Sequence, residues 1–374
     1  MRLLICAGGT GGGVNPALAV LQALSDEANP VLWIGGEGGM EEELVQRQNI
    51  PFKAIPAAGV HGVGMKALPG NLWRLVKGTA AARKIIHAFQ PDVMLFTGGY
   101  VAAPVAVAGG SIPKLLFVPD IEPGMALKFL ARFANRIAVS AEPSRSYFPR
   151  AEKVVVTGYP TRPELARWTA ETGRQEMGLS GDLPVLLVMG GSKGAHSINN
   201  ALTAILPEVL QIAQVIHITG KQDFAQAEQA LANLPGTLAG NYHPHPYLHD
   251  DMGAALASAD LAVARAGAST LGEFPQFGLP AILVPYPYAW RYQKVNAEFL
   301  VNARAAEMIT DGDLSTRLLP ALQRLLKDDN ARHAMRNAMQ SLGQPQASQA
   351  IANLVRELAA ASNPQGGTRE TKPC

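Results

Sequence analysis

The chain has 374 residues, of which 48% are hydrophobic and 17% charged, and its formal net charge is +2. This length predicts two domains rather than one, and so small a net charge does not indicate a nucleic-acid partner. Two cysteines, Cys6 and Cys374, are too few for a disulfide framework and indicate a reducing compartment. Since a strand is expected from Arg2 and no apolar run reaches about 20 residues, we expect neither a signal peptide nor a membrane span.

Short apolar runs alternate with helical segments in the first part of the chain, which predicts βαβ units around a parallel sheet. The helical segments include one from Pro16 and a long amphipathic one over 66–89. The turn-rich segment 158–163 (GYPTRP) ends this set and is the expected linker. The strands are expected at 2–7, 31–34, 52–55, 93–96, 114–118, 137–140 and 154–157.

The same alternation restarts after the linker, with helices that open at Ala195 and Arg291 and a closing helix at 348–361. We therefore expect an α/β protein with two nucleotide-binding-type domains, 1–158 and 159–345, followed by the segment of the closing helix, 346–361. The polar residues 362–374 are expected to form a disordered tail. The strands of the second set are expected at 185–189, 215–219, 261–264, 281–284 and 307–309.

Two strands run into glycine-rich turns that each open a helix, at 8–13 (GGTGGG) and 190–194 (GGSKG). Turns without a Cβ let the backbone approach a ligand, at a place where helix amides face an anion. Val14 breaks the dinucleotide fingerprint in the first turn, and in the second no Gly-Lys-Ser/Thr follows, so neither common nucleotide motif is favoured. Purely structural tight turns are the alternative, but two such turns in one chain favour two nucleotide-binding-type domains facing one cleft.

The segment 264–273 (ARAGASTLGE) places small residues where a strand becomes a helix, with Glu273 about two helical turns further on. Phosphate or sugar oxygens can reach the free amides of such a helix start, and a carboxylate can accept hydrogen bonds from two ribose hydroxyls. An ordinary surface glutamate is the alternative. On the next helix, the amides of Gln293 and Asn296 suit sugar hydroxyls, although alone they are unremarkable surface residues.

Several motifs occur in an order and spacing that resemble the MurG family, over about residues 2–360. They are 8–19 (GGTGGGVNPALA), 98–101 (GGYV), 190–195 (GGSKGA), 265–273 and Gln293-x-x-Asn296-Ala297. The resemblance implies the GT-B fold: two Rossmann-like domains, with the sugar nucleotide in the second, the acceptor mainly in the first, and a C-terminal helix that crosses back to the first.

The resemblance also implies an activity, that of an inverting hexosyltransferase. Such an enzyme moves N-acetylglucosamine (GlcNAc) from UDP-GlcNAc to undecaprenyl-linked N-acetylmuramyl-pentapeptide, which converts lipid I to lipid II. This step serves peptidoglycan synthesis, and thereby cell-wall biogenesis, cell shape and cell division. The expected location is peripheral, at the cytoplasmic face of the cell membrane.

The donor-site residues are carried over from the family motifs. Glu273 would bind the ribose, Gln293 the GlcNAc hydroxyls, and Arg162 would lie at the domain junction. Since 311–313 (DGD) is expected to be a turn, no motif suits a metal-bound diphosphate, and no cofactor is expected; helix N-termini, amides and Ser192 would stabilise the leaving UDP. The residues expected to contact UDP-GlcNAc are Thr10, Gly11, Gly12, Gly13, Arg162, Gly191, Ser192, Arg265, Ala268, Ser269, Thr270, Glu273 and Gln293.

The acceptor half departs from the family pattern. Gly13 occupies the position of a histidine thought to assist the acceptor, and Asp120 occupies that of an asparagine. An inverting transfer needs a base for the proton of the acceptor hydroxyl, and we expect Asp120 to be that base, with Glu122 as its substitute. The alternative is a loop carboxylate that caps the helix starting at Gly124.

Basic and apolar residues are interleaved over 66–84. Such an amphipathic helix can lie on anionic lipid, with each Lys or Arg contributing roughly 1 kcal/mol near the surface. A solvated helix with one face in the core is the alternative. The residues expected to contact the acceptor or the membrane are Tyr100, Lys66, Trp73, Arg74 and Lys77.

Two other functions stay open at this point. One is a related GT-B transferase with a different lipid or small-molecule acceptor, which would explain the altered acceptor loops. The other is a divergent sugar-nucleotide-binding protein with little catalysis, since the family histidine is replaced by Gly13.

Overall fold

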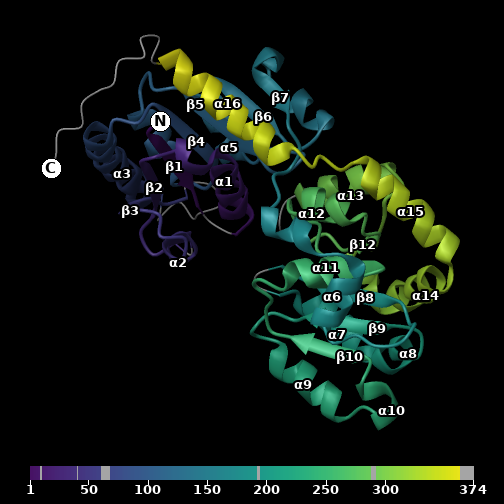
Figure 1. Ribbon diagram of the computed structural model, residues 1–374. Helices are drawn as coiled ribbons and strands as arrows, with labels where there is room; N and C mark the ends of the chain where they lie inside the picture. The colour runs from purple at the N-terminus through teal and green to yellow at the C-terminus, as the bar shows by residue number, and fades with distance from the viewer. Residues whose placement is uncertain (9–10, 40, 60–67, 192–193, 288–291, 363–374) are drawn as a thin grey trace. The chain divides into compact units, whose positions relative to one another are not determined.

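The computed structural model describes residues 1–374 except 9–10, 40, 60–67, 192–193, 288–291 and 363–374 (Figure 1). The chain divides into two compact units. Unit 1 comprises Met1–Pro119, Pro123–Thr157 and Gln346–Cys374, and unit 2 comprises Asp120–Glu122 and Gly158–Pro345. The expected boundary after 158 lies one residue from this division. The short segment Asp120–Glu122, which we expected in the first domain, belongs to unit 2.

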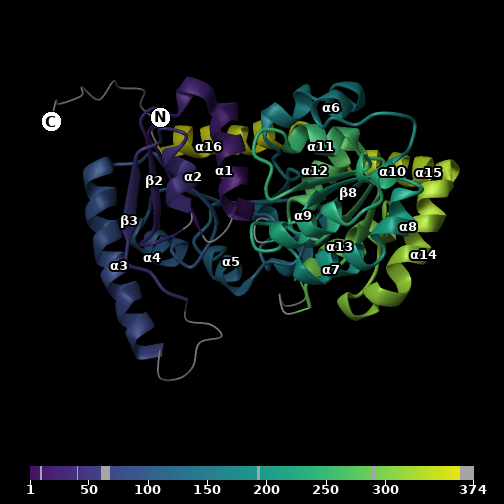
Figure 2. The same cartoon turned by 90° about the horizontal axis from the view of Figure 1, so that it is seen from below.

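The strands of unit 1 are β1 (Leu3–Ala7), β2 (Val31–Gly36), β3 (Phe52–Ile55), β4 (Val93–Gly98), β5 (Lys114–Val118), β6 (Arg136–Val139) and β7 (Val154–Val156). Its helices are α1 (Gly11–Leu24), α2 (Glu41–Gln46), α3 (Leu68–Phe89), α4 (Ala102–Ala108), α5 (Met125–Leu130) and α16 (Ala347–Ser362). Over the described residues the strands form one parallel sheet in the order β3-β2-β1-β4-β5-β6-β7. Helices α3, α4 and α5 cover one face, and α1 and α16 lie on the other (Figure 2). Burial on both faces explains why strands such as β1 (LLICA) are continuously apolar.

Helix α16 joins the first domain although it comes last in the sequence. Arg356 forms an ion pair with Glu27, with Nε 2.8 Å from Oε2, and donates a second hydrogen bond to the carbonyl oxygen of Ala23. These contacts attach α16 to the end of α1. The helix runs to Ser362, one residue further than expected, and the predicted disorder of 363–374, with Cys374, lies outside the described residues.

Helix α1 begins at Gly11, five residues before the expected start at Pro16, so the glycines 11–13 lie in its first turn. The prediction of a glycine turn up to residue 13 is therefore wrong. Glycine adopts helical backbone angles when packing favours them, and here the helix start packs against β4. Thr97 at the end of β4 donates through Oγ1 to the carbonyl oxygen of Gly13 at 2.6 Å.

The strands of unit 2 are β8 (Val185–Met189), β9 (Gln214–Ile218), β10 (Tyr242–His245), β11 (Leu261–Ala264), β12 (Ala281–Leu283) and β13 (Ala306–Met308). Its helices are α6 (Ala170–Glu176), α7 (His196–Ala204), α8 (Leu206–Leu210), α9 (Phe224–Ala232), α10 (Gly236–Ala239), α11 (Met252–Ser258), α12 (Thr270–Phe277), α13 (Tyr292–Asn302), α14 (Leu314–Lys327) and α15 (Asp329–Ser341). Over the described residues the strands form a second parallel sheet in the order β10-β9-β8-β11-β12-β13. Helices α7, α8 and α14 pack against one face of this sheet, in a core that includes Leu186, Val215 and Val263.

Strand β10 is missing from the sequence-based prediction. It lies at the edge of the sheet, next to β9, and contains Pro244 between His243 and His245. Proline is tolerated in an edge strand because the sheet does not need its missing N–H. The run therefore lacks the apolar character that identified the other strands, whose observed ends lie within two residues of those expected.

Candidate functional site

The strand order of unit 2 reverses between β8 and β11, which are neighbours in the sheet. Met189 and Ala264, the last residues of these strands, are register partners. The two connections that follow therefore leave the sheet side by side, one starting at Gly190 and the other at Arg265. Open parallel sheets bind ligands outside the carboxyl ends of their strands at such a reversal. The topology thus brings together two of the segments predicted to bind the donor.

Glycine is required at two positions in the loop after β8. Gly191 and Gly194 have φ angles of +93° and +76°, which L side chains rarely adopt. A Cβ on Gly194 would lie 2.3 Å from the carbonyl oxygen of Thr219, so the loop packs directly against the end of β9. A Cβ on Gly191 would meet no described atom within 4 Å, which leaves its backbone open to approach. The predicted phosphate-binding Ser192 lies outside the described residues.

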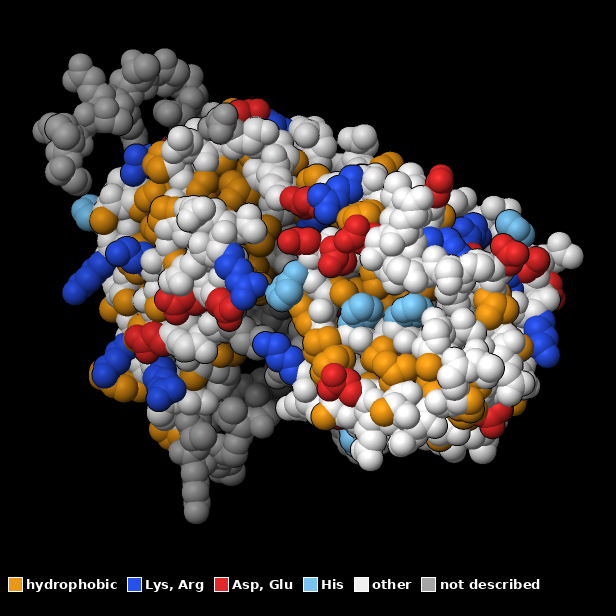
Figure 3. All heavy atoms as spheres, turned by 60° about the horizontal axis from the view of Figure 1, so that its bottom comes forward, with side chains coloured by type: hydrophobic (Ala, Val, Ile, Leu, Met, Phe, Trp, Pro, Cys, Tyr) orange, Lys and Arg blue, Asp and Glu red, His pale blue; other side chains and the backbone are white. Residues whose placement is uncertain are grey.

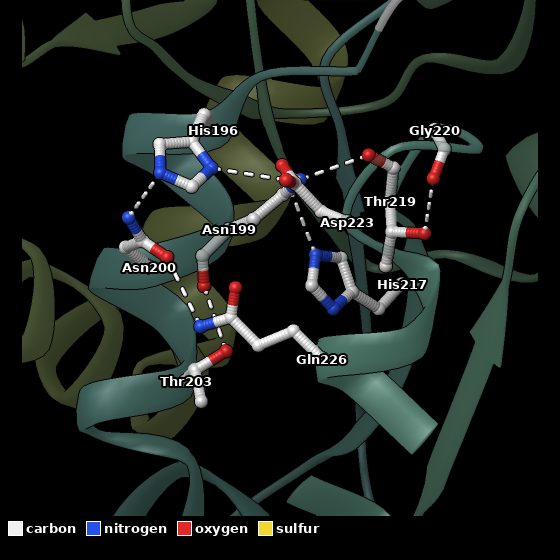
Figure 4. A network of polar contacts seen from close by, with 9 residues as sticks. All are labelled: His196, Asn199, Asn200, Thr203, His217, Thr219, Gly220, Asp223 and Gln226. Carbon is white, nitrogen blue, oxygen red and sulfur yellow. Dashed lines mark hydrogen bonds and ion pairs between the residues drawn. The ribbon is translucent and has the colours of Figure 1, made fainter. Parts of the chain in front are cut away.

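A buried polar network supports this loop (Figure 4). Asn199 on α7 donates through Nδ2 to the carbonyl oxygen of Thr219 at 2.8 Å and to Asp223 Oδ2 at 2.7 Å. Its Oδ1 lies 3.0 Å from His217 Nε2, and because this oxygen only accepts, Nε2 carries the proton. The Nδ1 atom of His217 then accepts from the Tyr242 hydroxyl at 2.8 Å. Burial lowers the pKa of His217 to about 4, so a neutral imidazole holds the network in place.

Arg265 follows β11, and its side chain is 9% exposed. One terminal nitrogen forms an ion pair with Asp311 at 2.6 Å and also donates to the carbonyl oxygen of Val284 at 3.1 Å. The other donates to Ser197 Oγ at 2.7 Å, and this hydroxyl in turn donates to Asp311 Oδ1. The guanidinium therefore joins the β11 loop, the first turn of α7 and the 3₁₀ turn Asp311–Asp313. Nothing in the sequence identified Asp311 as the partner of Arg265, because 46 residues separate them.

Glu273 lies in the first turn of α12, not two turns into the helix as expected, because the helix begins only at Thr270. It is half-buried, which argues against the alternative of an ordinary surface glutamate. Burial raises the pKa of Glu273, and the positive charge of Arg162 and a hydrogen bond from the Ser269 side chain oppose that increase. Thr270 Oγ1 donates to the carbonyl oxygen of Gly267 at 2.7 Å. The predicted residues Ala268, Ser269, Thr270 and Glu273 thus form one short stretch at a helix N-terminus.

The linker contributes two further groups to this side of unit 2. Among the described residues, the Nε of Arg162 is buried without a hydrogen-bond partner. Burial raises the pKa of Tyr159, the negative charges of Glu273 and Asp120 raise it further, and Arg162 opposes them. Glu273, Asp120 and Arg162 are therefore each within electrostatic reach of Tyr159, and Arg162 is also within reach of Glu273. A buried arginine donor beside a half-buried carboxylate suits an anionic ligand that carries hydroxyl groups.

Asp120, the predicted base, is half-buried, and its Oδ1 accepts a hydrogen bond from Asn296 Nδ2 at 2.8 Å. Burial raises the pKa of Asp120, and the bond from Asn296 opposes part of that increase. The N-cap of helix α5 is Gly124, and the carboxylate of Asp120 bonds Asn296 rather than an amide of this helix. The alternative in which Asp120 caps this helix is therefore wrong. Glu122, its proposed substitute, is 9% exposed.

The amide of Gln293, predicted to contact GlcNAc, has a fixed orientation. Its Oε1 accepts from the backbone N–H of Tyr286 at 2.9 Å, so the acceptor end of the amide faces the segment after β12. The Tyr286 ring lies over the guanidinium of Arg265, with 5.3 Å between the ring centroid and Cζ. The sequence did not indicate that Tyr286 connects these two predicted residues.

The predicted acceptor and membrane residues belong to unit 1. Trp73 and Tyr100 are 59% and 49% exposed, and Arg74 and Lys77 are also exposed on α3. Lys77 Nζ lies 5.5 Å from the centroid of the Trp73 ring. Figure 3 shows Lys and Arg side chains beside hydrophobic ones along the edge of unit 1 that α3 forms. Thr10 and Lys66 lie outside the described residues.

Comparisons with known proteins identify the family. Two family models match, the glycosyltransferase family 28 N-terminal domain over residues 3–139 and the C-terminal domain over residues 185–352. A protein from Roseiflexus sp. is 38% identical, covering 96% of this chain and 95% of its own length, and one from Desulforudis audaxviator is 36% identical, covering 96% and 99%. Both are named UDP-N-acetylglucosamine--N-acetylmuramyl-(pentapeptide) pyrophosphoryl-undecaprenol N-acetylglucosamine transferase. The crystal structure of Acinetobacter baumannii MurG superposes with a TM-score of 0.74 at 28% identity, covering 95% of this chain and 99% of that one.

The chain belongs to the MurG family. The resemblance inferred from the sequence motifs is therefore confirmed, as is the expected GT-B fold with two Rossmann-like domains. A UDP-GlcNAc 2-epimerase from Neisseria meningitidis, at 13% identity and a TM-score of 0.65, shares this fold. The MurG family is thus one of several groups of proteins built on the same pair of domains.

Proposed function

We propose that this chain transfers GlcNAc from UDP-GlcNAc to N-acetylmuramyl-(pentapeptide) pyrophosphoryl-undecaprenol, the lipid I to lipid II step of peptidoglycan synthesis. One observation carries the proposal. The glycine loop, the start of α12 and Glu273 lie together where the strand order of unit 2 reverses. The chain is also related over nearly its whole length to a transferase named for this reaction.

In this proposal the donor is held mainly by unit 2. Glu273 accepts hydrogen bonds from the ribose, and backbone amides at 190–194 and 268–270 bind the diphosphate, aided by Ser192. The unpartnered Nε of Arg162 donates to the same anionic ligand, and Gln293 binds the GlcNAc hydroxyls. The family motif also implies donor contacts for Thr10, Gly11, Gly12 and Gly13. Amide donors and helix N-termini stabilise the developing negative charge of UDP, so we expect the reaction to need no metal.

The chemical step is an inverting displacement. The acceptor hydroxyl attacks the anomeric carbon, the bond from that carbon to UDP breaks, and the hydroxyl proton passes to the Asp120 carboxylate. Burial raises the pKa of Asp120, which brings a carboxylate closer to the range in which a general base is effective at neutral pH. The product is a β-1,4-linked disaccharide on the lipid.

A transfer assay tests this proposal. The full chain is incubated with UDP-GlcNAc and the undecaprenyl-linked acceptor, and the lipid product and UDP are quantified by mass spectrometry. We expect one N-acetylhexosamine per acceptor and one UDP per transfer. UDP released from the donor without lipid product would favour a different acceptor, and donor binding without any turnover would favour a sugar-nucleotide-binding protein.

Replacing Glu273 by glutamine is expected to weaken UDP-GlcNAc binding about 10–100-fold, because hydrogen bonds to a charged group contribute roughly 1.5–3 kcal/mol. Titration calorimetry with UDP-GlcNAc and with UDP measures the change. Glu176→Gln, at an exposed position on α6, is the matched control and should bind like the wild type. Equal affinities in the two variants would exclude Glu273 from the donor site.

We also propose that unit 1 docks peripherally on an anionic membrane through α3, which suits a lipid-linked acceptor at the cytoplasmic face. Leu72, Trp73 and Val76 are each at least half exposed on this helix, and Arg74 and Lys77 lie among them. Such a surface pairs apolar insertion with attraction to anionic lipid. No described helix is both long enough and apolar enough to cross a bilayer.

The double substitution Arg74→Gln/Lys77→Gln is expected to weaken partitioning onto anionic vesicles about 30-fold, since each cation contributes roughly 1 kcal/mol near the surface. Co-sedimentation with vesicles of increasing phosphatidylglycerol content measures it. Lys221→Gln/Lys327→Gln, at two exposed lysines of unit 2, is the control and should change little. Binding that does not depend on anionic lipid would contradict the docking proposal.

A further inference from the structure

Asn296 on α13 is fully buried and links three segments of unit 2. Its Nδ2 donates to Asp120 Oδ1 at 2.8 Å and to the carbonyl oxygen of Ala266 at 3.1 Å. Its Oδ1 accepts the backbone N–H of Ile121 at 3.0 Å. Both amide hydrogens and the amide oxygen are therefore engaged within the protein, so this side chain serves the fold of the site rather than a sugar hydroxyl.

These bonds explain why the segment Asp120–Glu122 belongs to unit 2 although the residues on either side of it belong to unit 1. One bond holds the backbone of the segment and another holds its carboxylate. The third fixes the amide itself to the loop that follows β11, where the predicted donor residues begin. A single side chain thereby joins two residues that are 176 positions apart in the sequence.

We propose that Asn296 is a positioning residue that fixes the Asp120 carboxylate in unit 2, with Oδ1 held and Oδ2 left to receive the acceptor proton. The inference rests on the proposed function, in which Asp120 is the base. Asn296 touches neither substrate nor the reacting atoms; it acts through Asp120. A hydrogen bond to one carboxylate oxygen stabilises the charged form and restricts rotation of the group.

The inference predicts a specific pH effect. The charge of Asp120 acts on Tyr159, on which Arg162 and Glu273 also act, and Glu122 lies on the same segment as Asp120. The bond from Asn296 lowers the pKa of Asp120 against the effect of burial, so its loss raises that pKa further. Because a base must be deprotonated to act, the acidic limb of the kcat profile then moves to higher pH.

The test is Asn296→Asp, which keeps the side-chain shape and the acceptor for Ile121 but places a second carboxylate against Asp120. Two adjacent carboxylates titrate as a pair with one strongly raised pKa. We expect the acidic limb of kcat to shift upward by about one pH unit or more, with activity recovering at high pH and KM for UDP-GlcNAc nearly unchanged. Asn302→Asp, at an exposed position on the same helix, adds the same charge and should leave the limb in place.

The inference would be overturned if the acidic limb of the kcat profile did not shift, or if kcat fell by the same factor at every pH. Either result is expected if Asn296 has only a structural role. Should Asn296→Asp fail to fold, Asn296→Ala is measured with the same expected direction of shift. A wild-type chain without transfer activity would refute the proposed function instead. In that case the carboxyl ¹³C titration of Asp120 in wild type and variant tests the positioning role alone: an upward shift supports it, and no shift overturns it.

Discussion

Replacing Asp120 by asparagine is expected to lower kcat for GlcNAc transfer by about 10²–10⁴-fold, the usual contribution of a positioned general base. The amide has the shape of the carboxylate, and its oxygen can still accept the bond from Asn296 that the wild-type Oδ1 accepts at 2.8 Å. It cannot take up the proton of the acceptor hydroxyl. Initial rates at saturating donor and acceptor give kcat, and calorimetry with UDP shows that the donor site is intact.

Two further variants make the result specific. Glu122→Gln changes the neighbouring carboxylate and should reduce kcat far less; if it reduces kcat more than Asp120→Asn does, Glu122 is the base. Asp182→Asn, at an exposed position of unit 2, controls for the loss of one negative charge. A folded Asp120→Asn protein that turns over within a few-fold of the wild type would dismiss Asp120 as the base.

Replacing Arg265 by alanine is expected to destabilise unit 2 by about 3 kcal/mol, near the lower end of the cost of breaking a buried ion pair. The substitution leaves Asp311, whose side chain is 23% exposed, without its cation and removes the bonds to Ser197 and Val284. For a unit of this size the loss corresponds to a Tm lower by about 6–12 °C. Differential scanning calorimetry of the full chain measures the shift in the transition of unit 2.

The neighbouring pair supplies a matched control. Arg317 lies 3.9 Å from Asp313 of the same 3₁₀ turn, but its side chain is 58% exposed. Exposed pairs contribute about 0–1 kcal/mol, so Arg317→Ala should hardly change the Tm. If the Arg265→Ala and Arg317→Ala variants have the same Tm, Arg265 does not stabilise the contact between the β11 loop, α7 and the 3₁₀ turn.

Most of the fold could be predicted from the sequence because its strands are short apolar runs that are buried on both faces of the sheets. The exceptions have physical causes. Strand β10 carries Pro244 and two histidines and was missed, since an edge strand needs neither a full set of donors nor two apolar faces. Helix α1 includes glycines 11–13, which local preference assigns to a turn, because contacts with β4 outweigh that preference.

The site was only partly readable. Glycine loops and the start of α12 are local sequence patterns, so the sequence alone predicted Gly191, Ser269 and Glu273 as donor-binding residues. The bonds of Asp311 to Arg265 and of Asn296 to Asp120 join residues far apart in the chain. No local pattern encodes such pairs; they follow only once the sheet has brought their strands together.

We expect this chain to bind UDP-GlcNAc through backbone amides and the Glu273 carboxylate, without a metal. Titration calorimetry of the full chain with UDP-GlcNAc, with and without EDTA, tests it most directly. We expect saturable binding of one UDP-GlcNAc per chain, with the same affinity in the presence of the chelator. The absence of saturable binding to the folded protein, or its loss on adding EDTA, would contradict it.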